Sequence, residues 1–179
     1  IFKALRDNTD GAQDTFCSER IRIMEKYPWC SGVDIDLEKG DGYSTHEAST
    51  AMFKHIYETV KAYDSTKEMN ICLPGMTSVN GSVGGENWCV YGDLDKYCDT
   101  ASIMSYGMAW AGSAPGPVSP RSWLEGIYDY ATKVMNPDKV FLGMPAYGWN
   151  WQIYDTPENL GKYYRGTSHT YYAAKYWMQ

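Results

Sequence analysis

The chain has 179 residues, and its 16 basic and 22 acidic side chains give a formal net charge of −6 at pH 7. This acidic balance argues against nucleic acid and anionic membranes as partners, because both would require a basic surface. A hydrophobic content of 44% is enough for a sizeable core, and no apolar run reaches the roughly 18 residues of a membrane span.

Strand-like and helix-like segments alternate along the chain. In chain order the pattern predicts a helix over 18–27, a strand over 32–38, a helix over 44–63, strands over 69–74 and 101–106, a helix over 123–135 and a strand over 139–145. The second helix opens on Ser44-Thr45-His46-Glu47, which has the pattern of a capping box. The third follows Ser119-Pro120, an expected N-cap before a proline suited to the first helical turn.

Successive strands start about 30 to 40 residues apart, which is the repeat of a βα unit. Strands that alternate with helices predict an α/β fold with a parallel sheet and helices on its faces. Four units do not close a (β/α)8 TIM barrel, which typically takes ~250 residues. We therefore expect residues 1–179 to form part of a single catalytic barrel domain that is incomplete in this chain.

The first predicted strand carries the most informative pattern in the sequence. Its acids Asp34, Asp36 and Glu38 alternate with aliphatic residues, so one face is apolar and the other is a row of carboxylates. If this strand is buried, repulsion between the acids should leave at least one of them protonated at neutral pH. A protonated acid beside an ionised one is the arrangement needed for general acid catalysis at a glycosidic oxygen.

Three segments together resemble glycoside hydrolase family 18, the chitinase family. Ser31–Glu38 is similar to its DGxDxDxE signature, with Ser31 in place of the first Asp. Ile103–Tyr106 resembles the Met-x-Tyr motif of strand six, and Leu142–Trp149 resembles the Gly-hydrophobic-Pro-x-Tyr-Gly block of strand seven. The resemblance implies that the chain covers about strand four to strand seven of the barrel. The Pro-Gly-Pro-Val segment at 115–118 is similar to the bacterial branch that cleaves peptidoglycan, which also occurs in phage tails.

The resemblance implies a role for each acid in retaining, substrate-assisted hydrolysis of β-1,4 bonds at N-acetylglucosamine. Glu38 would protonate the glycosidic oxygen and later activate water. Asp36 would orient the acetamido group and stabilise the charge on its nitrogen, while Asp34 would share a proton with Asp36. Tyr106 would donate a hydrogen bond to the acetamido oxygen and fix its angle of attack.

Four further residues are candidates for substrate binding. Met104 and Tyr147 belong to the two later motifs, and Trp110 and Trp149 follow strand ends, where their rings would stack on sugars. By residue type alone, each tryptophan fits a core position equally well. Besides Ser31, a second position departs from the family: Gly107 stands where members commonly have Asp after the motif tyrosine. We expect weaker catalysis from this change and expect Gly107→Asp to raise the rate.

Metal and cofactor sites are not predicted. An EF-hand would require Gly at position 39 and Glu at position 45, where the chain has Lys39 and Thr45. The five cysteines form no CxxC pair and no zinc spacing, so most are expected to be reduced, although a disulfide among Cys72, Cys89 and Cys98 remains an alternative.

Three interpretations stay open at this stage. The first is a glycosidase acting on peptidoglycan, or on chitin, which implies a secreted, wall-associated or virion-associated protein. The second is a glycan-binding module that keeps the barrel and has lost activity; Gly107 favours it, whereas the intact Glu38 opposes it. The third is a barrel module within a larger cell-wall or phage-tail assembly.

Overall fold

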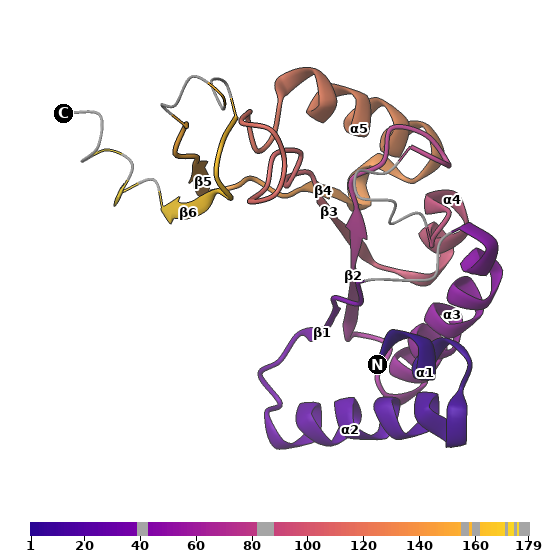
Figure 1. Cartoon of the computed structure of the whole chain (residues 1–179). Helices are drawn as coiled ribbons and strands as arrows, with labels where there is room; N and C mark the ends of the chain where they lie inside the picture. Colours follow the sequence, from indigo (N-terminus) through magenta and orange to yellow (C-terminus); the bar gives the residue numbers. More distant parts are fainter. Residues whose placement is uncertain are drawn as a thin grey trace.

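The computed structural model describes residues 1–38, 43–81, 88–154, 158, 162–170, 172–173 and 175. Its central sheet has four parallel strands in the order β1-β2-β3-β4, which is also their order along the chain (Figure 1). They are β1 (Gly32–Ile35), β2 (Glu68–Pro74), β3 (Thr100–Met104) and β4 (Val140–Leu142). A separate antiparallel pair follows, β5 (Tyr147–Asn150) with β6 (Thr167–Thr170). The predicted parallel sheet is confirmed.

Helices connect the strands and lie along the outer side of the bent sheet (Figure 1). They are α1 (Phe2–Arg6), α2 (Ala12–Lys26), α3 (His46–Tyr63), α4 (Tyr91–Leu94) and α5 (Arg121–Val134). Short 3-10 turns occur at η1 (Thr9–Gly11), η2 (Tyr43–Thr45), η4 (Asp95–Tyr97) and η5 (Pro137–Lys139). None of the described helices is both long and apolar enough to cross a membrane.

Both predicted caps are wrong in detail. The chain before α3 forms a 3-10 turn, so Thr45 rather than Ser44 is the N-cap, and its side chain makes no capping hydrogen bond. Pro120 is the N-cap of α5, because the Ser119 hydroxyl donates to the carbonyl oxygen of Ser105 at 2.5 Å instead. That bond joins the start of α5 to the end of β3.

The core lies between the sheet and the helices. The strand residues that face it are fully buried, among them Met69, Ile71, Leu73, Ala101 and Ile103. They meet buried helix residues such as Met52, Phe53, Ile56 and Ile127. The opposite face of the sheet is polar, and no described helix packs on it. The sheet is therefore apolar on one side and open on the other.

Two lysines, each just before a strand, form hydrogen bonds to the segment that precedes the neighbouring strand. Lys67, just before β2, donates from Nζ to the carbonyl oxygens of Cys30 and Pro28 at 2.6 and 3.3 Å. Lys139, just before β4, donates to the carbonyl oxygens of Asp95 and Cys98 at 2.5 and 2.9 Å. Because these carbonyl groups lie outside the strands, the lysines satisfy acceptors that no strand pairs.

All five cysteines are free, as expected from their spacing. Cys17, Cys89 and Cys98 are buried and behave as small apolar residues of the core. The alternative of a disulfide among Cys72, Cys89 and Cys98 is therefore wrong for this structure.

Candidate active site

The acidic segment keeps its two-residue alternation, although regular pairing stops before the segment ends. Strand β1 ends at Ile35, where its last partner in β2 is Ile71, so Asp36 and Glu38 lie beyond the ladder rather than inside a strand reaching position 38. The aliphatic residues Val33, Ile35 and Leu37 still pack on the core. The intervening acids are thereby directed to the open face, at and beyond the carboxyl end of β1.

The condition of burial, on which the expected shared proton depends, is not met among the described residues. Asp34, Asp36 and Glu38 are all exposed residues. The physical reason is that the open face of the sheet has no described helix or strand over it. Water can therefore reach all three acids, and the burial argument for a shared proton does not apply to this structure.

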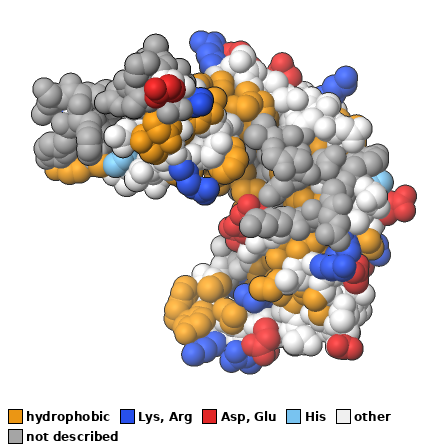
Figure 2. Space-filling view, in the orientation of Figure 1, with side chains coloured by type: hydrophobic (Ala, Val, Ile, Leu, Met, Phe, Trp, Pro, Cys, Tyr) orange, Lys and Arg blue, Asp and Glu red, His pale blue; other side chains and the backbone are white. Residues whose placement is uncertain are grey.

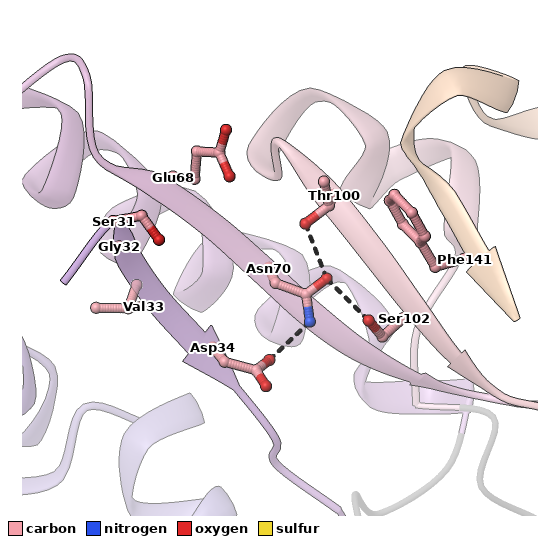
Figure 3. A pocket seen from close by; sticks show the side chains of 9 residues that line it. All are labelled: Ser31, Gly32, Val33, Asp34, Glu68, Asn70, Thr100, Ser102 and Phe141. Atoms are coloured by element: carbon pink, nitrogen blue, oxygen red, sulfur yellow. Dashed lines mark hydrogen bonds between the residues drawn. The ribbon is translucent and has the colours of Figure 1, made fainter. Parts of the chain in front are cut away.

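Asp34 lines a hollow on the open face that has a volume of about 430 Å³. Figure 3 shows this hollow with Asn70 of β2 beside Asp34 and with Thr100 and Ser102 of β3 on the far side of Asn70. The Asn70 amide nitrogen donates to Asp34 Oδ1 at 2.6 Å. The deepest acid is thus held by its neighbouring strand.

Cys72 lies two residues after Asn70, on the same face of β2, and it is close enough to the acids to be affected by their charges. Its thiol approaches Asp34 Oδ1 at 3.5 Å. Partial burial, followed by the negative charges of Asp34, Asp36 and Glu38, raises the pKa of this thiol to about 12. The three acids therefore act on one point of β2.

The raised pKa predicts slow chemistry at Cys72. At pH 8 a thiol with a pKa of about 12 holds roughly a thousandfold less thiolate than an ordinary one, so iodoacetamide should alkylate it slowly. Asp34→Asn removes one of the charges that raise the pKa, and we expect several-fold faster alkylation, followed by mass spectrometry of the Cys72 peptide. Asp129→Asn, on the exposed side of α5, is the matched control. Equal rates in the two variants would contradict the proximity of Asp34 to the thiol.

Tyr106 is brought to the same place from β3. Its phenol pKa is raised, chiefly by burial and then by Cys72, Asp36, Tyr147 and Glu38. The phenol therefore stays protonated at neutral pH and serves as a hydrogen-bond donor. β1 and β3 thus place the acids and this hydroxyl within electrostatic reach of one another.

Gly143 explains how the Tyr106 ring reaches this position. A Cβ atom at Gly143 would lie 2.7 Å from the Tyr106 ring, which is too close for two carbon atoms that are not bonded. The backbone there is fixed by two hydrogen bonds, from Gly143 N to Ile103 O and from Ser105 Oγ to Gly143 O, both 2.8 Å long. The glycine of the third motif is thus required by close packing against the tyrosine of the second.

Ring contacts connect Tyr106 to the residues of a second groove, which we call the aromatic groove. The Tyr106 and Tyr147 rings meet edge to face with centroids 6.4 Å apart, and Tyr147 meets Trp149 in the same way at 6.3 Å. Tyr147 and Trp149 line a groove of about 490 Å³ together with Met144 and Arg121. Met144 is 73% exposed, and exposed orange side chains are also visible over this part of the chain in Figure 2. Such a surface suits the apolar faces of sugar rings.

Met104 and Trp110, the remaining predicted residues, make no described hydrogen bond to the acids. Met104 ends β3 on the same face as Ser102, pairing in register with Pro74. Trp110 is 51% exposed in the loop between β3 and α5, and none of its described interactions involves the acids. The structure thus brings together the acids, Tyr106 and Tyr147, but leaves Trp110 in the loop.

Gly107 has a φ angle of +89°. This is a conformation that side chains rarely adopt, although no atom would obstruct a Cβ there. An Asp at this position would strain the turn, so the expectation that Gly107→Asp raises the rate loses its support. Glycine is instead the residue that this backbone favours.

Among the described residues, no group of three or more His, Cys, Asp or Glu side chains is arranged to hold a metal ion. Asn70 and Cys72 were not identified from the sequence, although a signal was present. They alternate with Met69, Ile71 and Leu73 within one strand, which marks a polar face opposite an apolar one. Their proximity to Asp34 depends on strand register, which the sequence alone does not specify.

The chain is similar to several known sequences. The model of the family described as glycosyl hydrolases family 18 matches residues 2–177. A cortical fragment-lytic enzyme of Bacillus anthracis is 33% identical over 150 residues, which are 83% of this chain and 33% of that protein. The uncharacterized glycosylase YvbX of Bacillus subtilis (strain 168) is 22% identical over 147 residues, 80% of this chain and 41% of that protein. The chain thus spans less than half the length of these relatives.

Solved structures share the fold. A chitinase from Chromobacterium violaceum ATCC 12472 superposes with a TM-score of 0.81 at 17% identity, covering 99% of this chain and 52% of that one. The spore cortex-lytic enzyme SleL of Bacillus cereus superposes with a TM-score of 0.77 at 23% identity, covering 96% and 37%. The predicted fold class, part of an α/β barrel, is confirmed.

Proposed function

The chain belongs to glycosyl hydrolase family 18, and from this premise we propose that its acids and Tyr106 serve retaining, substrate-assisted hydrolysis of β-1,4 bonds at N-acetylglucosamine. The observation that carries the proposal is the convergence of two strands on one site. Partial burial together with the charges of Asp36 and Glu38 raises the pKa of Tyr106. Asp36 and Glu38 thus lie within electrostatic reach of a neutral hydroxyl donor, which supports the proposed roles.

Each group has one task in the proposed reaction. Glu38 gives its proton to the glycosidic oxygen as the acetamido carbonyl oxygen attacks the anomeric carbon and the glycosidic bond breaks. Asp36 accepts a hydrogen bond from the acetamido nitrogen and stabilises the positive charge of the oxazolinium ion. Tyr106 donates to the acetamido oxygen and holds it in line for attack. Water then attacks the anomeric carbon, its proton passes to Glu38, and the product keeps the β configuration.

Peptidoglycan is the favoured substrate and chitin the second. Relatives named as a cortical fragment-lytic enzyme and as a spore cortex-lytic enzyme support the first, and relatives named as chitinases support the second. The aromatic groove supports either, because Tyr147 and Trp149 offer rings on which pyranose faces can stack. A secreted or wall-associated location follows from this substrate class.

A catalytically inactive glycan-binding module is the second candidate. The observation that favours it is Gly107, whose φ of +89° suits glycine and disfavours the Asp that family members commonly carry there. Such a module would use the same aromatic groove without turnover.

Product analysis tests the proposal. The full-length protein should release new reducing-end N-acetylglucosamine from purified peptidoglycan, identified by mass spectrometry, and NMR should detect the β anomer first. Chitin oligomers and a glucose-only polymer are the comparison substrates. An inverted product, or equal cleavage of the glucose-only polymer, would overturn the mechanism. Binding without cleavage of any glycan would support the inactive module instead.

A further inference from the structure

Asn70 occupies the centre of a hydrogen-bonded row that crosses three strands. In register it pairs with Asp34 of β1 on one side and with Thr100 of β3 on the other. Its amide nitrogen donates to Asp34 Oδ1 at 2.6 Å, and its amide oxygen accepts from Thr100 Oγ1 at 2.9 Å and Ser102 Oγ at 3.1 Å (Figure 3). All of these atoms lie on the open face of the sheet.

The two hydroxyl groups decide which way the amide points. With Thr100 and Ser102 donating to Oδ1, the Asn70 nitrogen faces the carboxylate of Asp34. The flipped amide would place its oxygen against a carboxylate oxygen of Asp34. Both atoms are hydrogen-bond acceptors, so no hydrogen bond could form between them. β3 therefore fixes the orientation of a β2 amide that in turn contacts a β1 acid.

We propose that Asn70 is a positioning residue for the reaction, acting through Asp34. Both described hydrogen bonds to Asp34, from Asn70 and from Cys72, end on Oδ1. Because both bonds end on one oxygen, they fix the direction of the Asp34 carboxylate, next to Asp36 on the same face, whose own carboxylate must be oriented when the acetamido group arrives. The inference rests on the proposed function, because Asp34 has this task only in substrate-assisted hydrolysis.

The position of Asn70 supports a role beyond packing. Asp34 is exposed, so water could solvate it without any protein partner. A donor held in place by the protein instead fixes the orientation of the carboxylate, since the side chain loses rotamers that water alone would permit. The residue two places earlier on the same strand and face is Glu68, which lines the same hollow and offers no donor to Asp34.

Substitution of Asn70 separates positioning from packing. Asn70→Leu keeps a similar volume without donor or acceptor, and we expect kcat to fall about 10-fold with KM within about 2-fold of wild type, since the lost hydrogen bond is to a charged group. In an Asp34→Ala background the same change should cost less than about 2-fold, because the partner is already absent. Glu68→Gln is the matched control and should keep wild-type kcat. An equal loss in both backgrounds would overturn the proposal.

Thr100 provides a second series if Asn70→Leu does not fold. Thr100→Val is isosteric without the hydroxyl and should lower kcat about 3-fold, since Ser102 still donates, whereas Thr100→Ser should restore it. Equal activity of the two variants would contradict the role of β3 in orienting the amide.

An NMR readout stays informative without turnover. The carboxyl carbon resonance of Asp34 should shift in Asn70→Leu and stay in place in Glu68→Gln. No shift would overturn the positioning role even in an inactive protein. An inactive wild type with the shift present would instead mark a failure of the proposed function.

Discussion

Glu38→Gln should lower turnover of N-acetylglucosamine glycans by about 10²- to 10⁴-fold, which is the usual contribution of general acid catalysis. The amide keeps the shape of the carboxylic acid and cannot give a proton to the glycosidic oxygen. Glu38 is exposed beyond the end of β1, so the substitution leaves the core intact and sugar binding should persist. Steady-state kinetics and calorimetric titration with a chitin oligomer measure the two quantities separately.

Glu68→Gln is again the appropriate control for that experiment. It makes the same chemical change on the same open face, at the far end of β2 from the proposed reaction. A loss of turnover in both variants would point to the charge of this face rather than to proton donation by Glu38. Unchanged hydrolysis in Glu38→Gln would place the acid at another residue.

Asp36→Asn should reduce kcat by about 10²- to 10³-fold, the range observed when one group that stabilises transition-state charge is removed. Asp34→Asn should reduce it by only about 10-fold, because Asp34 acts through Asp36. A thiazoline that mimics the oxazolinium ion should lose affinity for Asp36→Asn in proportion to the loss of rate. Inhibition constants and kcat/KM for both variants measure this order, and a larger effect at Asp34 would contradict the assigned roles.

The sequence predicts the acidic face well, because the period of a strand is local information. The alternation of Asp34 and Asp36 with apolar residues persists past the end of β1, since Leu37 still packs on the core. The exposure of the acids was not predictable from the strand pattern, because burial depends on what covers a face and not on the strand that carries it. The site roles of these residues remain predictions.

Helix α1 was not predicted because its stability comes from distant residues. It has only five residues, and isolated helices of that length are unstable in water. Phe2 lies edge to face against Trp88 with ring centroids 5.0 Å apart, and Trp88 stacks on Phe53 at 5.6 Å. No local pattern at residues 2–6 indicates a partner more than 80 positions away. The strand register that pairs Asn70 with Asp34 was not predicted either, because it also depends on residues far apart in the sequence.

The order of the strands bears on how the chain assembles during synthesis. Each strand pairs with the one made just before it, so every βα unit can dock as it leaves the ribosome without waiting for a distant segment. Lys67 and Lys139 stabilise units that are already made. Each is synthesised with a later strand and donates hydrogen bonds to backbone carbonyl oxygens of the preceding unit. Assembly in this direction completes the acid strand β1 before β3. The hydroxyl of Tyr106 and the aromatic groove are then added to a carboxylate row that is already in place.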